Sequence, residues 1–188
     1  MIKVAGGRVR GIPLAVLKGR DIRPTSGRAR QAIFSMLGRD VVDAAVLDLF
    51  AGSGALGIES LSRGAGAAVF VDKNPRAVEI IRANLKRTKL EDHAEVMSCD
   101  FRLALARFRQ QGLMFNLVFL DPPYRTEFLG LALNNLVEQG LLAENARVIA
   151  EHPAESPLSR TEGLPLFQVR RYGSIGITVL GGMEPGSG

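Results

Sequence analysis

One short stretch of this 188-residue chain limits its possible folds more than any other. The run Val46–Phe50 is apolar except for Asp48, which is typical of a strand buried on both faces of a parallel sheet. The glycine-rich turn Ala51–Gly54 follows, and Ala55–Arg63 then has the apolar spacing of a helix that ends at Gly64. A buried strand, a tight turn and a helix in this order indicate a βαβ unit, and therefore an α/β fold.

The alternation of strands and helices continues toward the C-terminus. Further helices are expected at Pro75–Lys89, from about Asp100 to Gln111, and at Phe128–Glu138. Further strands are expected at Ala67–Val71, Ala94–Met97, Leu117–Leu120, Ala146–Glu151, Leu166–Arg171 and Ile175–Leu180. The last two strands are joined at Tyr172-Gly173, so they should be antiparallel. This pattern predicts a mostly parallel sheet with helices on both faces.

The first 40 residues differ from the rest of the chain in charge. They hold nine Lys or Arg and two acids, so the net charge of +5 comes from this segment, and the remainder is slightly acidic. Such asymmetry favours a polyanionic partner, with nucleic acid as the first candidate.

The same N-terminal segment contains two short structural elements. Glycines break residues 1–22 into short strands, which predicts a hairpin. Thr25 or Ser26 can cap a helix over Gly27–Leu37. Arg28 and Arg30 lie in the first turn of that helix, where positive charge opposes the helix dipole. Their position therefore hints at a binding role.

Several classes of protein are disfavoured by composition. Cys99 is the single cysteine, so no intramolecular disulfide can form, which fits a reducing cytoplasm. No apolar run approaches the roughly 20 residues that span a bilayer, and no apolar core of a secretory signal is visible. His93 and His152 stand alone, without metal-ligand spacing. We expect a cytoplasmic protein without a membrane segment or a metal.

A nucleoside-binding fingerprint follows the first buried strand. Gly52, Gly54 and Gly57 form the pattern G-x-G-x-x-G, and Asp72 comes 20 residues after Gly52. The glycines let a ligand approach the backbone, and the acid can accept hydrogen bonds from ribose hydroxyls. The pattern alone does not choose between NAD and other nucleoside cofactors. Asp48 disfavours the anionic pyrophosphate of NAD and suits a ligand with a positive end, such as S-adenosylmethionine (SAM).

A second pair of candidate nucleoside contacts follows the third strand of this pattern. Asp100 could accept a hydrogen bond from an adenine amino group, and Phe101 could pack on the ring. Each residue also has a structural interpretation, since Asp100 can cap a helix and Phe101 can belong to the core.

The segment Asp121–Tyr124, Asp-Pro-Pro-Tyr, ends the strand Leu117–Leu120 abruptly, because proline has no N–H to donate to a sheet. In an open α/β sheet, ligands bind at this carboxyl edge. An exocyclic amine is a poor nucleophile because its lone pair is delocalised. The Asp121 carboxylate and the Pro122 carbonyl could accept its two N–H groups and direct the lone pair toward an electrophilic methyl, while Tyr124 stacks on the planar group. This would be catalysis by positioning and electrostatic preorganisation.

In this order, the motifs resemble those of class I SAM-dependent amino-methyltransferases. Other residues narrow the resemblance to the bacterial 16S rRNA (guanine-N2)-methyltransferase family of the RsmD type: Gly6-Gly7-Arg8, Arg10-Gly11, Arg23-Pro24-Thr25, Arg28, Arg30, Phe34, Leu61–Ala65 and Tyr172-Gly173. The resemblance covers about residues 1–180. The chain departs from the family at Ser26-Gly27-Arg28, where Thr-Asp-Arg is usual, and at Gln31 and Ser35, where Glu and Asn are usual.

The resemblance implies a Rossmann-like class I methyltransferase fold, with a seven-stranded, mostly parallel sheet whose last strand is antiparallel. It implies three parts: a basic N-terminal extension of hairpin and helix (1–40), a methyltransferase domain (41–180) and a flexible tail (181–188). The implied activity is methyl transfer from SAM to the N2 amine of one guanine in 16S rRNA. The substrate would be the RNA itself, the 30S subunit or an assembly intermediate, and the enzyme would be a monomer.

Site residues are carried over from the family by position. The expected methyl-transfer residues are Asp121, Pro122, Pro123 and Tyr124. The expected SAM contacts are Asp48, Phe50, Ala51, Gly52, Ser53, Gly54, Asp72, Lys73, Asp100 and Phe101. A guanine amine must be splayed out of its helix to reach such a pocket, and the basic segment would hold the phosphates. The expected RNA contacts are Arg8, Arg10, Arg23, Thr25 and Arg28.

Three other functions remain as alternatives. An amino-methyltransferase acting on DNA adenine or protein glutamine more often has Asn in place of Asp121, and larger target-recognition regions. An NAD-dependent oxidoreductase is disfavoured by Asp48 and by the lack of an evident acid or base for hydride transfer. A non-catalytic nucleic-acid-binding module is disfavoured, because the glycine turn and Asp121–Tyr124 would have no function in it.

Overall fold

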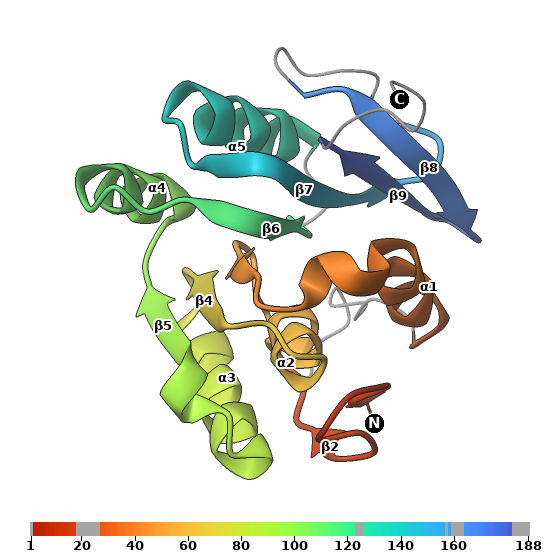
Figure 1. Ribbon diagram of the computed structural model, residues 1–188, viewed down its shortest axis with the longest axis vertical. Coiled ribbons are helices and arrows are strands. Elements are labelled where there is room, and N and C mark those ends of the chain that lie inside the picture. The colour runs from red at the N-terminus through yellow and green to blue at the C-terminus, as the bar shows by residue number, and fades with distance from the viewer. Residues whose placement is uncertain (1, 18–26, 123–125, 157, 159–163, 182–188) are drawn as a thin grey trace.

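The computed structural model describes residues 2–17, 27–122, 126–156, 158 and 164–181. Its main feature is a seven-stranded sheet with the strand order β5-β4-β3-β6-β7-β9-β8 (Figure 1). The strands are β3 (Ala45–Asp48), β4 (Ala67–Asp72), β5 (Ala94–Ser98), β6 (Phe115–Leu120), β7 (Leu142–Pro153), β8 (Leu166–Tyr172) and β9 (Ile175–Leu180). Strand β9 is antiparallel to both β7 and β8, whereas the pairs among β3 to β7 are parallel. The expected seven-stranded sheet with an antiparallel last strand is confirmed.

Helices cover both faces of this sheet, as expected. The helices are α1 (Gly27–Leu37), α2 (Ala55–Ser62), α3 (Pro75–Thr88), α4 (Phe101–Gln110) and α5 (Thr126–Glu138), with short 3₁₀ turns η1 (Gly38–Val41) and η2 (Glu91–His93). Successive side chains of a strand point to opposite faces. Val46 accordingly packs in a core with α1, α2 and α3, and Leu47 packs in a second core with α4 and α5. The sheet is therefore buried on both faces around β3.

Most element boundaries agree with the sequence pattern to within two residues, but β7 is longer than expected. The strand was expected over Ala146–Glu151 and extends over Leu142–Pro153. Its first part contains Glu144 and Asn145, which are exposed, and the pairing of β6 with β7 shifts register after Phe115. The irregular first half of β7 has no alternating apolar pattern, so the sequence could not show it.

The expected N-terminal hairpin is present as the antiparallel pair β1 (Ile2–Lys3) and β2 (Pro13–Leu14). Its turn lies against the end of α2, where the Arg8 N–H donates to the Ser62 carbonyl over 2.7 Å. Gly7 has a φ of +77°, and a Cβ there would lie 1.9 Å from the Ser62 carbonyl oxygen. Only glycine fits this close approach of two backbones. The division of the chain at residue 40 stays a prediction.

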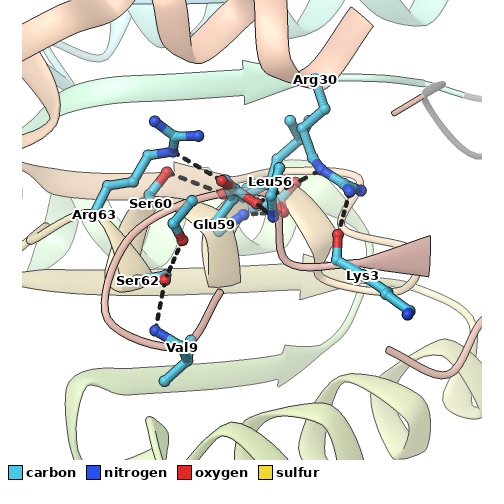
Figure 2. A network of polar contacts seen from close by, with 12 residues as sticks. Lys3, Val9, Arg30, Leu56, Glu59, Ser60, Ser62 and Arg63 are labelled. Carbon is cyan, nitrogen blue, oxygen red and sulfur yellow. Dashed lines mark hydrogen bonds and ion pairs between the residues drawn. The ribbon is translucent and has the colours of Figure 1, made fainter. Parts of the chain in front are cut away.

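A buried polar network centred on Glu59 of α2 joins the hairpin and α1 to the main sheet (Figure 2). The Glu59 carboxylate accepts from the Ala5 N–H over 2.7 Å and from Arg63 Nε over 2.8 Å. It also forms an ion pair with Arg30 of α1, whose Nε lies 3.7 Å away. Arg30 donates in turn to the Lys3 carbonyl and is only 3% exposed. The binding role suggested for Arg30 by its place in the helix is therefore wrong, because the side chain is a buried part of the fold.

Candidate active site

The acidic motifs end neighbouring strands at one edge of the sheet. Asp48, the last residue of β3, pairs with Phe119 of β6 and with Phe70 of β4. Asp121 and Asp72 each follow two residues after those partners. On the next strand, Asp72 pairs with Ser98, and Asp100 follows two residues later. Since neighbouring strands lie about 5 Å apart, Asp100, Asp72, Asp48 and Asp121 form one row along the carboxyl edge.

The glycine turn between β3 and α2 is held by Asp72. Gly52 and Gly54 have φ values of +55° and +74°, which L-residues rarely adopt. The Asp72 carboxylate accepts from the Gly52 N–H over 2.8 Å, and its second oxygen accepts from the Asn74 N–H. A Cβ on Gly57 would lie 2.3 Å from the ring of Phe70, so the third glycine lets α2 pack closely on β4. Half-buried Ser53 lies in the turn, and Ala51, which follows half-buried Phe50, is buried.

Asp48 is buried beneath this turn, at 3% exposure. Its Oδ2 accepts a 3.0 Å hydrogen bond from the Gly57 N–H in the first turn of α2. Burial raises the pKa of the Asp48 carboxyl to about 7, against a lowering by the Gly57 hydrogen bond and a further rise from nearby Asp72. A buried acid with so high a pKa is stabilised in its ionised form by an adjacent positive charge. The direct contact between Asp48 and SAM stays a prediction.

The raised pKa of Asp48 predicts a pH-dependent stability. The unfolded chain releases this proton near pH 4 and the folded chain near pH 7, so the free energy of unfolding falls as pH rises between these values. In Asp48→Asn this contribution is absent, while an amide oxygen can still accept from Gly57. The variant should gain stability over wild type from pH 5 to pH 8, by at most about 4 kcal/mol. Urea unfolding of both proteins at pH 5 and pH 8 measures this effect. The prediction is contradicted if the difference in free energy of unfolding between the variant and wild type is the same at both pH values.

An aromatic row lies beside the acids. The rings of Phe50 and Phe101 are 5.3 Å apart, and Phe128 of α5 meets Phe101 edge-on at 6.3 Å. Lys73, an exposed residue, places Nζ 5.9 Å from the centre of the Phe128 ring. Asp100 caps α4 by accepting from the Arg102 N–H. The two structural interpretations, a cap for Asp100 and a core place for Phe101 at 5% exposure, thus hold here, and their contacts with SAM stay predictions.

The first two residues of the expected methyl-transfer motif lie at the end of β6. Asp121 and Pro122 are half-buried and follow Leu120, the last residue of the strand. They stand next to the start of the glycine turn, because the Leu49 N–H donates to the Phe119 carbonyl over 3.1 Å. Pro123 and Tyr124 lie outside the described residues. The structure therefore brings Asp121 and Pro122 to the turn and leaves the catalytic role a prediction.

Asn84 of α3 is a site residue that sequence reasoning missed. Its fully buried amide donates to the carbonyls of Ser53, in the glycine turn, and Ala15, each over 2.9 Å. Its oxygen also accepts from the Ala15 N–H over 2.8 Å. Asn84 therefore ties the glycine turn to the N-terminal segment. A lone amide on the buried face that includes Ile81 and Leu85 was the signal that could have identified it.

The expected RNA contacts are less closely grouped than the acids of the carboxyl edge. Arg28 is exposed in the first turn of α1, and Arg23 and Thr25 lie outside the described residues. Arg8 and Arg10 are exposed in the hairpin turn, at the C-terminal end of α2, whereas the glycine turn precedes its N-terminal end. An eight-residue helix is about 12 Å long, so these two cations lie at a distance from the acidic row.

Neither a metal-ligand cluster nor a membrane-spanning helix is found in the described residues. Across the described ranges, no three His, Cys, Asp or Glu side chains gather as a metal site would require. The helices in the same part of the chain are too short or too polar to cross a membrane. His152, which stood alone in the sequence, is buried on β7 and its Nε2 lies 2.7 Å from the Thr178 hydroxyl.

Known proteins are similar to this chain in both fold and sequence. A family model described as "Conserved hypothetical protein 95" matches residues 2–181. "Putative rRNA methyltransferase YlbH" of Bacillus subtilis is 36% identical over 95% of this chain and 97% of its own length. "Ribosomal RNA small subunit methyltransferase D" of Escherichia coli K12 is 37% identical over 84% of this chain and 77% of its own. The solved structure "Putative methyltransferase yhhF from Escherichia coli" superposes with a TM-score of 0.84, at 31% identity, covering 96% and 97% of the two chains.

The strand order, the glycine turn and these structural relatives define a methyltransferase of the Rossmann-like class. The extent of the matches narrows this class further. The chain belongs to the Conserved hypothetical protein 95 family, the RsmD family, as the resemblance predicted.

Proposed function

We propose that this protein transfers a methyl group from SAM to the exocyclic N2 amine of a specific guanine in 16S rRNA. The observation that carries the proposal is the register of β6, β3 and β4, which sets Asp121 beside the glycine turn and Asp72 on its other side. The name of the E. coli relative, a ribosomal RNA small subunit methyltransferase, supports the RNA substrate. The choice of guanine N2 rests on the family resemblance.

The residues at the edge fit SAM in chemical terms. The Asp72 carboxylate ends β4 next to the glycine turn, where a ribose would lie, and its two oxygens have further lone pairs besides those that accept from Gly52 and Asn74. The buried Asp48 carboxyl favours a cationic ligand in its surroundings. Half-buried Phe50, whose ring lies 5.3 Å from that of buried Phe101, provides aromatic surface for an adenine ring. When bound, SAM supplies an electrophilic methyl group.

The acceptor side of the reaction is assigned to the end of β6. The Asp121 carboxylate and the Pro122 carbonyl accept the two amine N–H groups and orient the nitrogen lone pair toward the glycine turn. Tyr124 stacks on the guanine. The methylated amine is acidic enough to lose its proton to water, so Asp121 need not act as a base. The barrier is lowered by orientation and by fixed charge rather than by covalent catalysis.

The wider setting is part of the same proposal. The reaction takes place in the cytoplasm without a metal, and the enzyme acts as a monomer on 16S rRNA, the 30S subunit or an assembly intermediate. A methyltransferase of DNA adenine or protein glutamine is the second candidate, since the Asp121 carboxylate and the Pro122 carbonyl could accept the N–H groups of any planar amine. Asp121, where those enzymes more often have Asn, favours the guanine substrate.

Calorimetry and nucleoside mapping test the proposal together. The protein should bind SAM and S-adenosylhomocysteine and should not bind NAD, because the acidic row repels a pyrophosphate. Mapping of methylguanosine in 16S rRNA from cells that lack the gene should then reveal one guanine that is unmethylated at N2. The purified protein should methylate this guanine when SAM is added. Lack of affinity for both SAM and its product would refute any methyl transfer by this chain. An unchanged rRNA with methylated DNA or protein would favour the second candidate.

A further inference from the structure

The end of α3 lies against the N-terminal hairpin, although the two are about 70 residues apart in the sequence. Arg87 Nη1 donates to the Pro13 carbonyl of β2 over 3.2 Å. One turn earlier on the same helix, Asn84 holds Ala15 by two hydrogen bonds. Figure 1 shows the hairpin beside the lower part of α3, in keeping with these contacts. The hairpin segment and the C-terminal turn of α3 are thus in direct contact.

The surface of these two segments is strongly basic. We define the remote basic surface as six exposed side chains, three from the hairpin and three from the end of α3: Lys3, Arg8, Arg10, Lys86, Arg87 and Lys89. No acid lies between Ile80 and Lys89, and the exposed acids Glu91 and Asp92 begin beyond its border. The charge count along the chain attributed all basicity to the first 40 residues. Folding adds the cations of α3, which lie in the part of the sequence that is acidic on balance.

The remote basic surface lies far from the methyl-transfer edge. Helix α3 begins at Pro75, three residues after Asp72 in the acidic row, and runs for 14 residues away from it. At 1.5 Å per residue this length is about 21 Å. A single flipped nucleotide in the site cannot reach so far, since one extended nucleotide of a strand spans far less. Any anion that occupies both places must be a polymer.

The surface also lacks the features of a lipid or protein contact. Among the described residues, the large exposed apolar side chains are Val42, Leu103, Leu113, Met114, Leu131, Leu166 and Val169, and none belongs to the hairpin or to α3. Interfacial membrane binding needs inserted apolar side chains, and stable protein interfaces have aromatic or apolar anchors. Exposed Lys and Arg without such anchors are typical of contacts with nucleic-acid phosphates.

We infer that the remote basic surface binds the phosphate backbone of a structured RNA about 20 Å from its methylated base. This inference rests on the proposed function and narrows its substrate to an RNA with a helical stem that extends from the target loop along α3. The stem is held by charge and shape rather than by base sequence, because side chains cannot read the deep groove of an RNA duplex. A short single strand that carries the target base reaches only the acidic row and does not contact the remote basic surface.

Charge reversal on α3 tests the inference, with α4 as the matched control. Lys86→Glu with Lys89→Glu changes two cations at the end of α3, and Arg107→Glu with Arg109→Glu makes the same change in the last turn of α4, across the sheet. Each double variant is titrated with intact 16S rRNA over a series of KCl concentrations without SAM. The α3 variant should bind at least about tenfold more weakly at low salt, with a salt slope smaller by about 1.5. The α4 variant should bind like wild type.

Further measurements distinguish a failure of this inference from a failure of the proposed function. A fragment of about three nucleotides centred on the mapped guanine should bind wild type and the α3 variant alike, because at roughly 3.4 Å per stacked nucleotide it does not reach the surface. Equal binding of 16S rRNA by both double variants, or an equal loss in both, would overturn the inference while methylation by wild type still stands. If the α3 variant loses 16S rRNA binding but wild type does not methylate the RNA, only the proposed function is overturned. Lys86→Gln with Lys89→Gln should give about half the effect if the reversed variant does not fold.

Discussion

Asp121→Ala should abolish methylation of 16S rRNA while SAM still binds. The carboxylate is assigned to orient the acceptor amine, an interaction made on the way to the transition state rather than with the methyl donor. Removing one preorganised partner of this kind costs roughly 10²- to 10³-fold in rate. SAM affinity should change by less than about twofold, since the glycine turn, Asp48 and Asp72 are untouched. Single-turnover methylation and calorimetry measure the two effects separately.

Two comparisons keep this prediction specific. Asp121→Asn retains one acceptor oxygen and a similar shape, so it should keep partial activity above that of the Ala variant. Asp92→Ala removes an exposed acid of η2 and should methylate like wild type. Thermal melts of all variants check the fold. An Ala variant that stays active, or one that loses SAM binding to the same extent as activity, would refute the role assigned to Asp121.

Glu59→Ala should destabilise the protein by about 3–5 kcal/mol, because it leaves a buried cation without its counter-charge. Arg30 is 3% exposed, and in the described part of the chain its Nε and Nη1 have no hydrogen-bond partner, so the Glu59 carboxylate is the charge that compensates it. The Ala5 N–H also loses its acceptor. For a chain of this size the midpoint of thermal unfolding should fall by roughly 10 °C.

The controls for Glu59 distinguish charge from shape and position. Glu59→Gln keeps an acceptor for Ala5 and lacks the charge, so its loss of stability should be smaller than that of the Ala variant. Glu79→Ala removes an exposed acid of α3 and should change stability by less than about 0.5 kcal/mol. Proteolysis should cut the Glu59→Ala hairpin before the sheet unfolds. Equal stability of Glu59→Ala and Glu79→Ala would show that the network contributes nothing.

Much of the fold and part of the site could be predicted because their signals are local. The apolar runs Val46–Phe50, Ala67–Val71 and Leu117–Leu120 predicted β3, β4 and β6, and the glycine turn predicted how β3 meets α2. In a parallel sheet, motifs that end strands gather at one edge whatever their separation in sequence. Asp121 and Gly52 could therefore be placed together before the register of β3 and β6 was known.

Residues whose roles depend on packing between distant segments could not be predicted in this way. Arg30 has the sequence context of an exposed helix start, yet its burial depends on Lys3 and Glu59 from two other elements. Asn84 has no partner near it in the chain and meets Ala15 and Ser53 only after folding. Charge counted along the chain likewise missed Lys86 and Lys89, because proximity to the hairpin is a property of the folded surface.

The amide of Asn84 joins the glycine turn to the N-terminal segment, so the two segments are energetically dependent on each other. Its donors are shared between Ser53 and Ala15, so ordering either segment lowers the entropy cost of ordering the other. By reciprocity, if the turn binds a methyl donor and the N-terminal segment binds RNA, as proposed, each ligand would strengthen binding of the other by the same factor. Under the proposed function, one buried side chain would thus favour the state that holds both substrates over a state that holds either alone.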